Sequence, residues 1–158
     1  MEWSLASNSG EVVAAWSAVK EPDGRLSCDF RLSVTRDGGH RTQSDDAEAA
    51  VEVHLRGLVA NQSLVGSLAE RLVSWLELPL AEFRRSPLAV EAALGSRGWD
   101  EFVRLSLASS EPGSGQHAVA TLEYEVCGVR GGVSFEVDQS CIRVFAEGMR
   151  DAAQGANT

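Results

Sequence analysis

The stretch SCDFRLSVT, from Ser27 to Thr35, alternates apolar and polar residues along its whole length. A period of two predicts a β-strand that buries one face and exposes the other. The segment Glu11 to Val19 precedes it and has apolar residues on both of its sides, and the turn residues Glu21 to Gly24 separate the two. We therefore expect these two segments to form a β-hairpin, with a short edge strand at Trp3 to Leu5.

Four further segments show strand alternation. The first, Ala50 to Leu55, follows a polar stretch. The other three come later in the chain and are separated by short segments rich in turn residues: Phe102 to Leu107, His117 to Cys127 and Gly132 to Val137. Closely spaced strands of this kind predict an antiparallel meander.

Two segments have helical periodicity. Apolar residues at spacings of one, three and four begin near Ser63 and stop before Pro79, which predicts an amphipathic helix. Asp138 is a suitable N-cap for a final helix, whose apolar stripe consists of Ile142, Phe145, Ala146 and Met149. We also expect a short helix at Leu88 to Leu94, between Pro87 and Gly95.

This order of elements predicts an α+β fold. We expect residues 1–158 to form a single domain, with residues 155–158 as a frayed tail. The sheet would have five to seven antiparallel strands, and the two main helices would cover one of its faces. The other face would be open to water.

Composition and charge narrow the class of protein. The chain has 158 residues, a hydrophobic fraction of 44% and no uninterrupted apolar run of 18 residues, which predicts a globular domain without a membrane span. Its net charge of −9 disfavours binding to nucleic acid and favours a cationic partner. Arginine accounts for all basic residues except Lys20, a bias typical of a GC-rich bacterial genome. Residues 1–10 lack the features of a secretory signal, so we expect a cytoplasmic protein.

The sequence contains none of the spaced motifs that encode a catalytic mechanism or a phosphate-binding loop. Its three histidines, His40, His54 and His117, are isolated from other metal-ligating residue types, so we expect neither a metal site nor a cofactor. Cys28, Cys127 and Cys141 are odd in number and far apart, which favours free structural thiols. Cys141 is the most plausible reactive group because it falls in the first turn of a helix. Without a neighbouring histidine, it does not predict an enzyme.

Acidic residues provide the candidate binding site. In the hairpin of 117–137, a four-residue turn would place Glu123 opposite Glu136, and a two-residue turn at Gly128 and Val129 would make them diagonal neighbours. Either register groups them with Glu125, and like charges paired across strands destabilise a sheet unless a cation relieves them. A second acidic group is Asp45, Asp46 and Glu48 in a polar loop. An ordinary solvated surface with a nearby arginine, such as Arg31 or Arg104, remains the alternative.

The segment VSFEVDQSCIRVFAEGMRDA, from Val133 to Ala152, resembles the closing strand, acidic turn and last helix of the WapI family of bacterial immunity proteins. The order of elements from Leu68 onward is also similar to that family, whereas residues 1–20 are not. The resemblance implies a non-catalytic intracellular protein that binds and neutralises a cognate toxin, most simply through a basic toxin domain. Two alternatives are an acidic secretion chaperone and a small enzyme or ligand-binding domain that lacks a recognisable motif.

Overall fold

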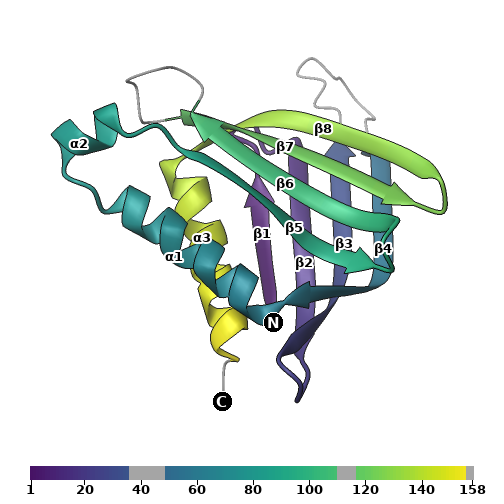
Figure 1. The fold of residues 1–158 in the computed structure, drawn as a ribbon. Helices are drawn as coiled ribbons and strands as arrows, with labels where there is room; N and C mark the ends of the chain where they lie inside the picture. The colour runs from purple at the N-terminus through teal and green to yellow at the C-terminus, as the bar shows by residue number, and fades with distance from the viewer. Residues whose placement is uncertain (36–48, 110–116, 156–158) are drawn as a thin grey trace.

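The computed structural model describes residues 1–35, 49–109 and 117–155. They form an α+β fold with one eight-stranded antiparallel sheet, in which the strands follow one another in chain order (Figure 1). The elements are β1 (Glu2–Ala6), β2 (Val12–Lys20), β3 (Arg25–Thr35), β4 (Ala49–Asn61), α1 (Gln62–Leu76), α2 (Leu80–Arg85), β5 (Ala89–Arg97), β6 (Glu101–Ser109), β7 (His117–Val126), β8 (Val129–Asp138) and α3 (Gln139–Gln154). The α+β class is confirmed, but the sheet is larger than the expected five to seven strands. No helix in the described ranges is long and apolar enough to cross a bilayer.

The sheet consists of two four-stranded halves, β1–β4 and β5–β8, which are joined at one point. Within the described part of the chain, the only paired positions between β4 and β5 are Val59 and Ser96. At this junction Gly95 has a φ of +136°, and a side chain there would meet Leu58 at about 3.0 Å. The glycine lets the two strands separate beyond the junction, and β5–β8 then run across the direction of β1–β4 (Figure 1).

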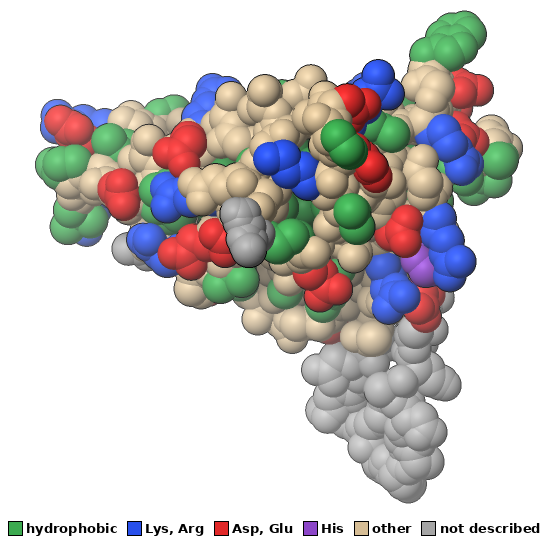
Figure 2. Space-filling view, turned by 90° about the horizontal axis from the view of Figure 1, so that it is seen from below, with side chains coloured by type: hydrophobic (Ala, Val, Ile, Leu, Met, Phe, Trp, Pro, Cys, Tyr) green, Lys and Arg blue, Asp and Glu red, His purple; other side chains and the backbone are tan. Residues whose placement is uncertain are grey.

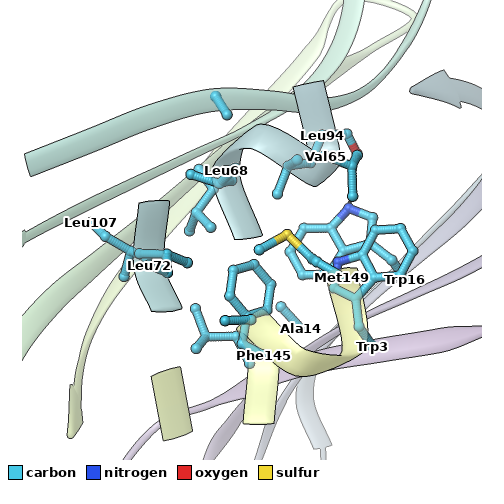
Figure 3. Packing of buried hydrophobic residues seen from close by; sticks show 14 of the residues in the cluster. Trp3, Ala14, Trp16, Val65, Leu68, Leu72, Leu94, Leu107, Phe145 and Met149 are labelled. Atoms are coloured by element: carbon cyan, nitrogen blue, oxygen red, sulfur yellow. The ribbon is translucent and has the colours of Figure 1, made fainter. Parts of the chain in front are cut away.

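The inner face of both halves forms one hydrophobic core with α1 and α3. Trp16 on β2, Leu94 on β5 and Leu107 on β6 all meet the apolar stripes of the two helices (Figure 3). The α3 stripe includes Phe145, whose ring centroid lies 5.7 Å from that of Trp16. Both helices therefore pack on the same face of the sheet, and the opposite face is left to solvent.

Local signals in the sequence fix the ends of these helices. The side chain of Asn61 accepts a hydrogen bond from the N–H of Leu64 at 3.1 Å and starts α1. Asp138 starts α3 in the same way, accepting from the N–H of Cys141 at 3.0 Å, as the sequence predicts. Gly155 ends α3 in the left-handed conformation.

The expected short helix at Leu88 to Leu94 is wrong, because this segment from Ala89 onward belongs to strand β5. Val90, Ala92 and Leu94 are buried at alternate positions and face the core. Alanine-rich sequence has a high helix propensity, but here pairing with β6 and burial of the alternate face outweigh it. The helix in this region is instead α2, where Phe83 packs on Trp75.

Candidate protein-binding surface

The loop between β5 and β6 exposes an aromatic side chain. Arg97 pairs with Glu101 across the end of this hairpin, and Gly98, Trp99 and Asp100 form the three-residue loop. Gly98 has a φ of +67°, a conformation that favours glycine and lets the loop reverse tightly. Trp99 is 95% exposed, although tryptophan is normally one of the most buried residues by area. The loop thus presents an indole to solvent.

A carboxylate braces this loop against its neighbours. Glu101 accepts from the guanidinium of Arg97 at 2.6 Å with one oxygen. Its other oxygen accepts from the backbone N–H of Cys127 at 3.0 Å, in the turn between β7 and β8. Arg97 also donates to the carbonyl of Arg56 on β4 at 3.3 Å. The loop that carries Trp99 is therefore tied to two other parts of the sheet.

These contacts determine the ionisation of the bracing groups. The hydrogen bond from Arg97, followed by those from Cys127, lowers the pKa of the Glu101 carboxyl below its ordinary value. The same carboxylate raises the pKa of the exposed Cys127 thiol, first because it accepts a hydrogen bond from the protonated Sγ and then because its negative charge disfavours the thiolate. Glu101 thus stays charged at neutral pH, and Cys127 stays protonated.

A second exposed apolar residue lies beside this loop. Val129 begins β8 directly after the turn that Glu101 contacts, and its side chain is 63% exposed. The next residue, Arg130, forms an ion pair with Glu125 at 2.7 Å. We call the group of Arg97, Trp99, Glu101, Cys127 and Val129 the hairpin tip. It combines two apolar side chains with a rim of paired charges.

Neither of the two expected β7–β8 registers forms, so the predicted neighbourhood of Glu123 and Glu136 across this strand pair is wrong. The β7–β8 turn consists of Cys127 and Gly128, which shifts the register from both alternatives considered. Glu123 is opposite Gly132, and Glu136 is opposite Val119. Gly132 and Glu136 are four positions apart on β8, which corresponds to about 13 Å along a strand.

The charged side chains on the outer face of β6, β7 and β8 are of both signs, so this face is not uniformly acidic. Glu125 is paired with Arg130, and Glu123 is directly opposite Arg104 on β6. On the side of the molecule shown in Figure 2, acidic and basic side chains are likewise interspersed. The other predicted acidic residues, Asp45, Asp46 and Glu48, lie outside the described residues.

A shallow groove of about 250 Å³ lies on the outer face of β1–β4. Its polar lining residues include Glu2, Asp29, Arg31 and His54. Within the described part of the chain, no group of three or more histidine, cysteine or acidic side chains is arranged to hold a metal ion. The groove therefore offers exposed polar groups without a metal-binding cluster among them.

The thiol singled out in the sequence is not activated. Burial, and then the hydrogen bond with Asp138, raise the pKa of Cys141 above its ordinary value. The negative N-cap thus counteracts the effect expected from the helix N-terminus. Cys28 is buried on β3, and burial raises its pKa to about 11.

Sequence reasoning did not identify the hairpin tip. One signal was present, because Trp99 lies between Gly98 and Asp100, and both neighbours are typical turn residues. A large aromatic residue in a tight turn has few ways to reach the core. The bracing role of Glu101 could not be read from the sequence, since Cys127 is 26 positions away.

No family model and no curated protein matches this chain. Among solved structures, the chain is similar to that of the plant transcriptional regulator PBF-2. The sequence identity is 7%, the TM-score is 0.45, and the alignment covers 98% of this chain and 81% of the other. A likeness at this level does not bear on what either protein binds.

Proposed function

We propose that this protein is a non-catalytic binding protein that docks through its hairpin tip on a partner protein, and that this partner is a bacterial toxin that it neutralises. The observation that carries the proposal is the exposed indole of Trp99 on a braced loop. Tryptophan is enriched among the residues that dominate binding energy, because its large ring buries much area and loses little conformational entropy.

The bracing of the loop supports this role. A side chain that must be ordered during association reduces the net affinity, whereas a loop already held in place does not incur that cost. Glu101 holds the Trp99 loop through Arg97 on one side and Cys127 on the other. Exposed Val129 extends the apolar contact area beside it.

The charge of the chain favours a basic partner. Its net charge of −9 would attract a cationic protein over long distances and raise the association rate. A toxin as the partner follows from the resemblance of residues 133–152 to the WapI immunity family. Charge and resemblance thus agree on a basic toxin domain, and the hairpin tip supplies the point of contact.

The experiment uses the product of the neighbouring reading frame as the candidate partner, copurified with the wild-type protein. Trp99→Ala should weaken this binding at least about 30-fold, equivalent to about 2 kcal/mol, as expected for an interface anchor. Val144→Ala is a matched control, because Val144 is also exposed and apolar but lies on α3. Equal affinities of wild type and Trp99→Ala would contradict the assignment of the hairpin tip, and a catalytic activity of the purified chain would contradict the function.

Tryptophan fluorescence offers an independent readout. Trp3, Trp16 and Trp75 are buried, whereas Trp99 is exposed, so quenching by iodide should report Trp99 almost exclusively. Binding of the partner should remove this quenching. Persistence of the quenching in the complex would show that the indole stays in water.

A further inference from the structure

Strand β8 is an edge of the sheet, and its outward backbone groups are largely unused. In a two-residue hairpin, the residues that flank the turn bond to each other, here Val126 and Val129. The alternation of an antiparallel pair then points the backbone groups of Arg130, Gly132, Ser134 and Glu136 away from β7. The bond from the Asn8 N–H to the Glu136 carbonyl at 2.9 Å agrees with this direction.

Only the Glu136 end of this edge is occupied among the described residues. No other backbone bond from the outward side of β8 is formed within the described part of the chain. The register with β7 is regular, without a bulge, and β8 contains neither proline nor lysine. Bulges, prolines and lysines are among the features by which proteins usually protect an edge strand from pairing. The edge from Arg130 to Ser134 is therefore suited to accept another strand.

A glycine in this edge opens a path to a carboxylate. Gly132 is opposite Glu123, and the Cβ of any larger residue at this position would lie 2.8 Å from the carbonyl oxygen of Leu122 and 3.7 Å from the side chain of Glu123. Because Gly132 has no side chain, a group on an added strand could extend over it toward the Glu123 carboxylate. Glu136 is exposed on the same outer face, farther along β8.

The inner side of the edge has a different character. Along β8, Val129 and Val133 alternate with the residues of the outer face, so both side chains are on the inner face. Val129 is exposed and Val133 is half-buried. Between them, Gly131 is covered by the ring of Tyr124. An added strand would thus meet the Glu123 carboxylate and the Arg130–Glu125 ion pair on its outer face, and apolar groups on its inner face.

We infer that β8 accepts an extended segment of the partner as a ninth strand along Arg130 to Ser134, with a basic side chain beside Glu123 and apolar side chains beside Val129 and Val133. This inference rests on the proposed function and specifies how the partner is recognised. Main-chain hydrogen bonds would supply affinity, and the alternating side chains would supply specificity. A second copy of the chain is a poorer occupant, because two copies with a charge of −9 each repel one another.

The test uses nine-residue peptides as probes, labelled with a fluorophore and followed by anisotropy. The first alternates arginine and valine, the second replaces every arginine by glutamate, and the third is the first with every second backbone amide N-methylated. The arginine–valine peptide should bind the wild-type protein. The other two should bind at least about tenfold more weakly, because one lacks charge complementarity and the other lacks edge hydrogen bonds.

Variants of one residue locate the binding at the edge. Ser134→Pro removes an outward N–H that bonds to nothing described in the fold, and should weaken binding of the arginine–valine peptide about tenfold. Ser134→Ala keeps the N–H and loses only the side-chain contact with Thr121, so it should bind like wild type. Glu123→Gln should weaken binding and reduce its salt dependence. Circular dichroism melting curves verify that each variant folds.

Several results would overturn the inference. These are absence of binding to the arginine–valine peptide, equal binding of the glutamate peptide, or unchanged binding in a folded Ser134→Pro variant. Sedimentation showing a wild-type dimer that Ser134→Pro dissociates would assign the edge to a second copy instead. Val144→Ala, an exposed apolar position on α3, should leave peptide binding unchanged. If Trp99→Ala abolishes binding of the whole partner while Ser134→Pro does not, the proposed function stands and strand addition fails.

Discussion

The indole N–H of Trp16 donates a hydrogen bond to the carbonyl oxygen of Leu94 at 2.8 Å, and this bond joins the two halves of the sheet across the core. Trp16 lies on β2 and Leu94 on β5, 78 positions later in the chain. Among the described residues, the strands of the two halves pair only at Val59 and Ser96, so this side-chain bond supplies a further link beside the bond from Arg97 to the carbonyl of Arg56. Trp3 stacks on Trp16, with ring centroids 6.0 Å apart, but its own buried N–H has no hydrogen-bond partner among the residues that the structure describes.

These two tryptophans should respond differently to the same substitution. Trp16→Phe loses ring area and leaves the buried carbonyl of Leu94 without its indole partner, whereas Trp3→Phe loses similar area and removes an unsatisfied donor. An unsatisfied buried polar group costs about 1 to 3 kcal/mol, so Trp16→Phe should be the more destabilising by at least about 1 kcal/mol. Urea denaturation of both variants measures the difference, and equal losses would show that the indole bond contributes nothing.

Gly148→Ala should destabilise the protein. A Cβ at this position of α3 would lie 2.6 Å from the Cβ of Trp3, closer than real side chains approach. The forced shift of α3 away from β1 should cost about 1 to 3 kcal/mol, more than the roughly 1 kcal/mol that alanine gains in helix propensity. Gly66→Ala on α1 is the control, since its Cβ would make an ordinary contact at 3.4 Å with Ala153. It should be neutral or stabilising in thermal unfolding, and a loss as large as that of Gly148→Ala would contradict the packing argument.

Asp138→Ala should cost about 1 kcal/mol of stability by removing the N-cap of α3. Hydrogen bonds from Ser140, and then from the N–H of Cys141, lower the pKa of Asp138 below its ordinary value. Its charged form therefore stabilises the fold above the unfolded pKa of about 4, and this contribution is lost as the pH falls through the lower folded pKa.

The matched variant Asp138→Asn keeps a capping oxygen that does not titrate. The stability difference between wild type and this variant should shrink as the pH falls from 6 to 3, by a modest amount because Asp138 is partly exposed and screened. Urea denaturation at several pH values measures it. A difference that stays constant with pH would mean that the charge of Asp138 does not contribute.

Cys127 should react with iodoacetamide more slowly than an ordinary exposed thiol. Its neighbour Glu101 raises its pKa, which lowers the thiolate fraction at neutral pH. Glu101→Gln removes the negative charge, so the alkylation of Cys127 should become faster and its pH profile should shift to lower pH. Mass spectrometry of the alkylated peptide follows the rate at this site. Buried Cys28 serves as the internal control and should remain unmodified in both proteins.

The sequence by itself determined the elements whose signals are local. The alternation of Ser27 to Thr35 predicts a strand, and β3 forms there, because each side chain of a strand points to the face opposite that of its neighbour. The capping oxygen of Asp138 and the apolar stripe after it predict α3, because both depend on spacings of three and four residues. Such signals need no knowledge of distant partners.

Only the tertiary structure decided the features that depend on distant contacts. The segment of β5 has alanines that suit either a helix or a strand, and pairing with β6 made it a strand. The β7–β8 register depended on which residues formed the turn, and Cys127 adopted a positive φ of 51° that its sequence does not favour. A shift of the turn by one residue changes every cross-strand partner, which is why the expected pairing of Glu123 with Glu136 failed. The bracing of the Trp99 loop was likewise decided by the bond between Glu101 and Cys127, since only the assembled sheet brings these two hairpin ends together.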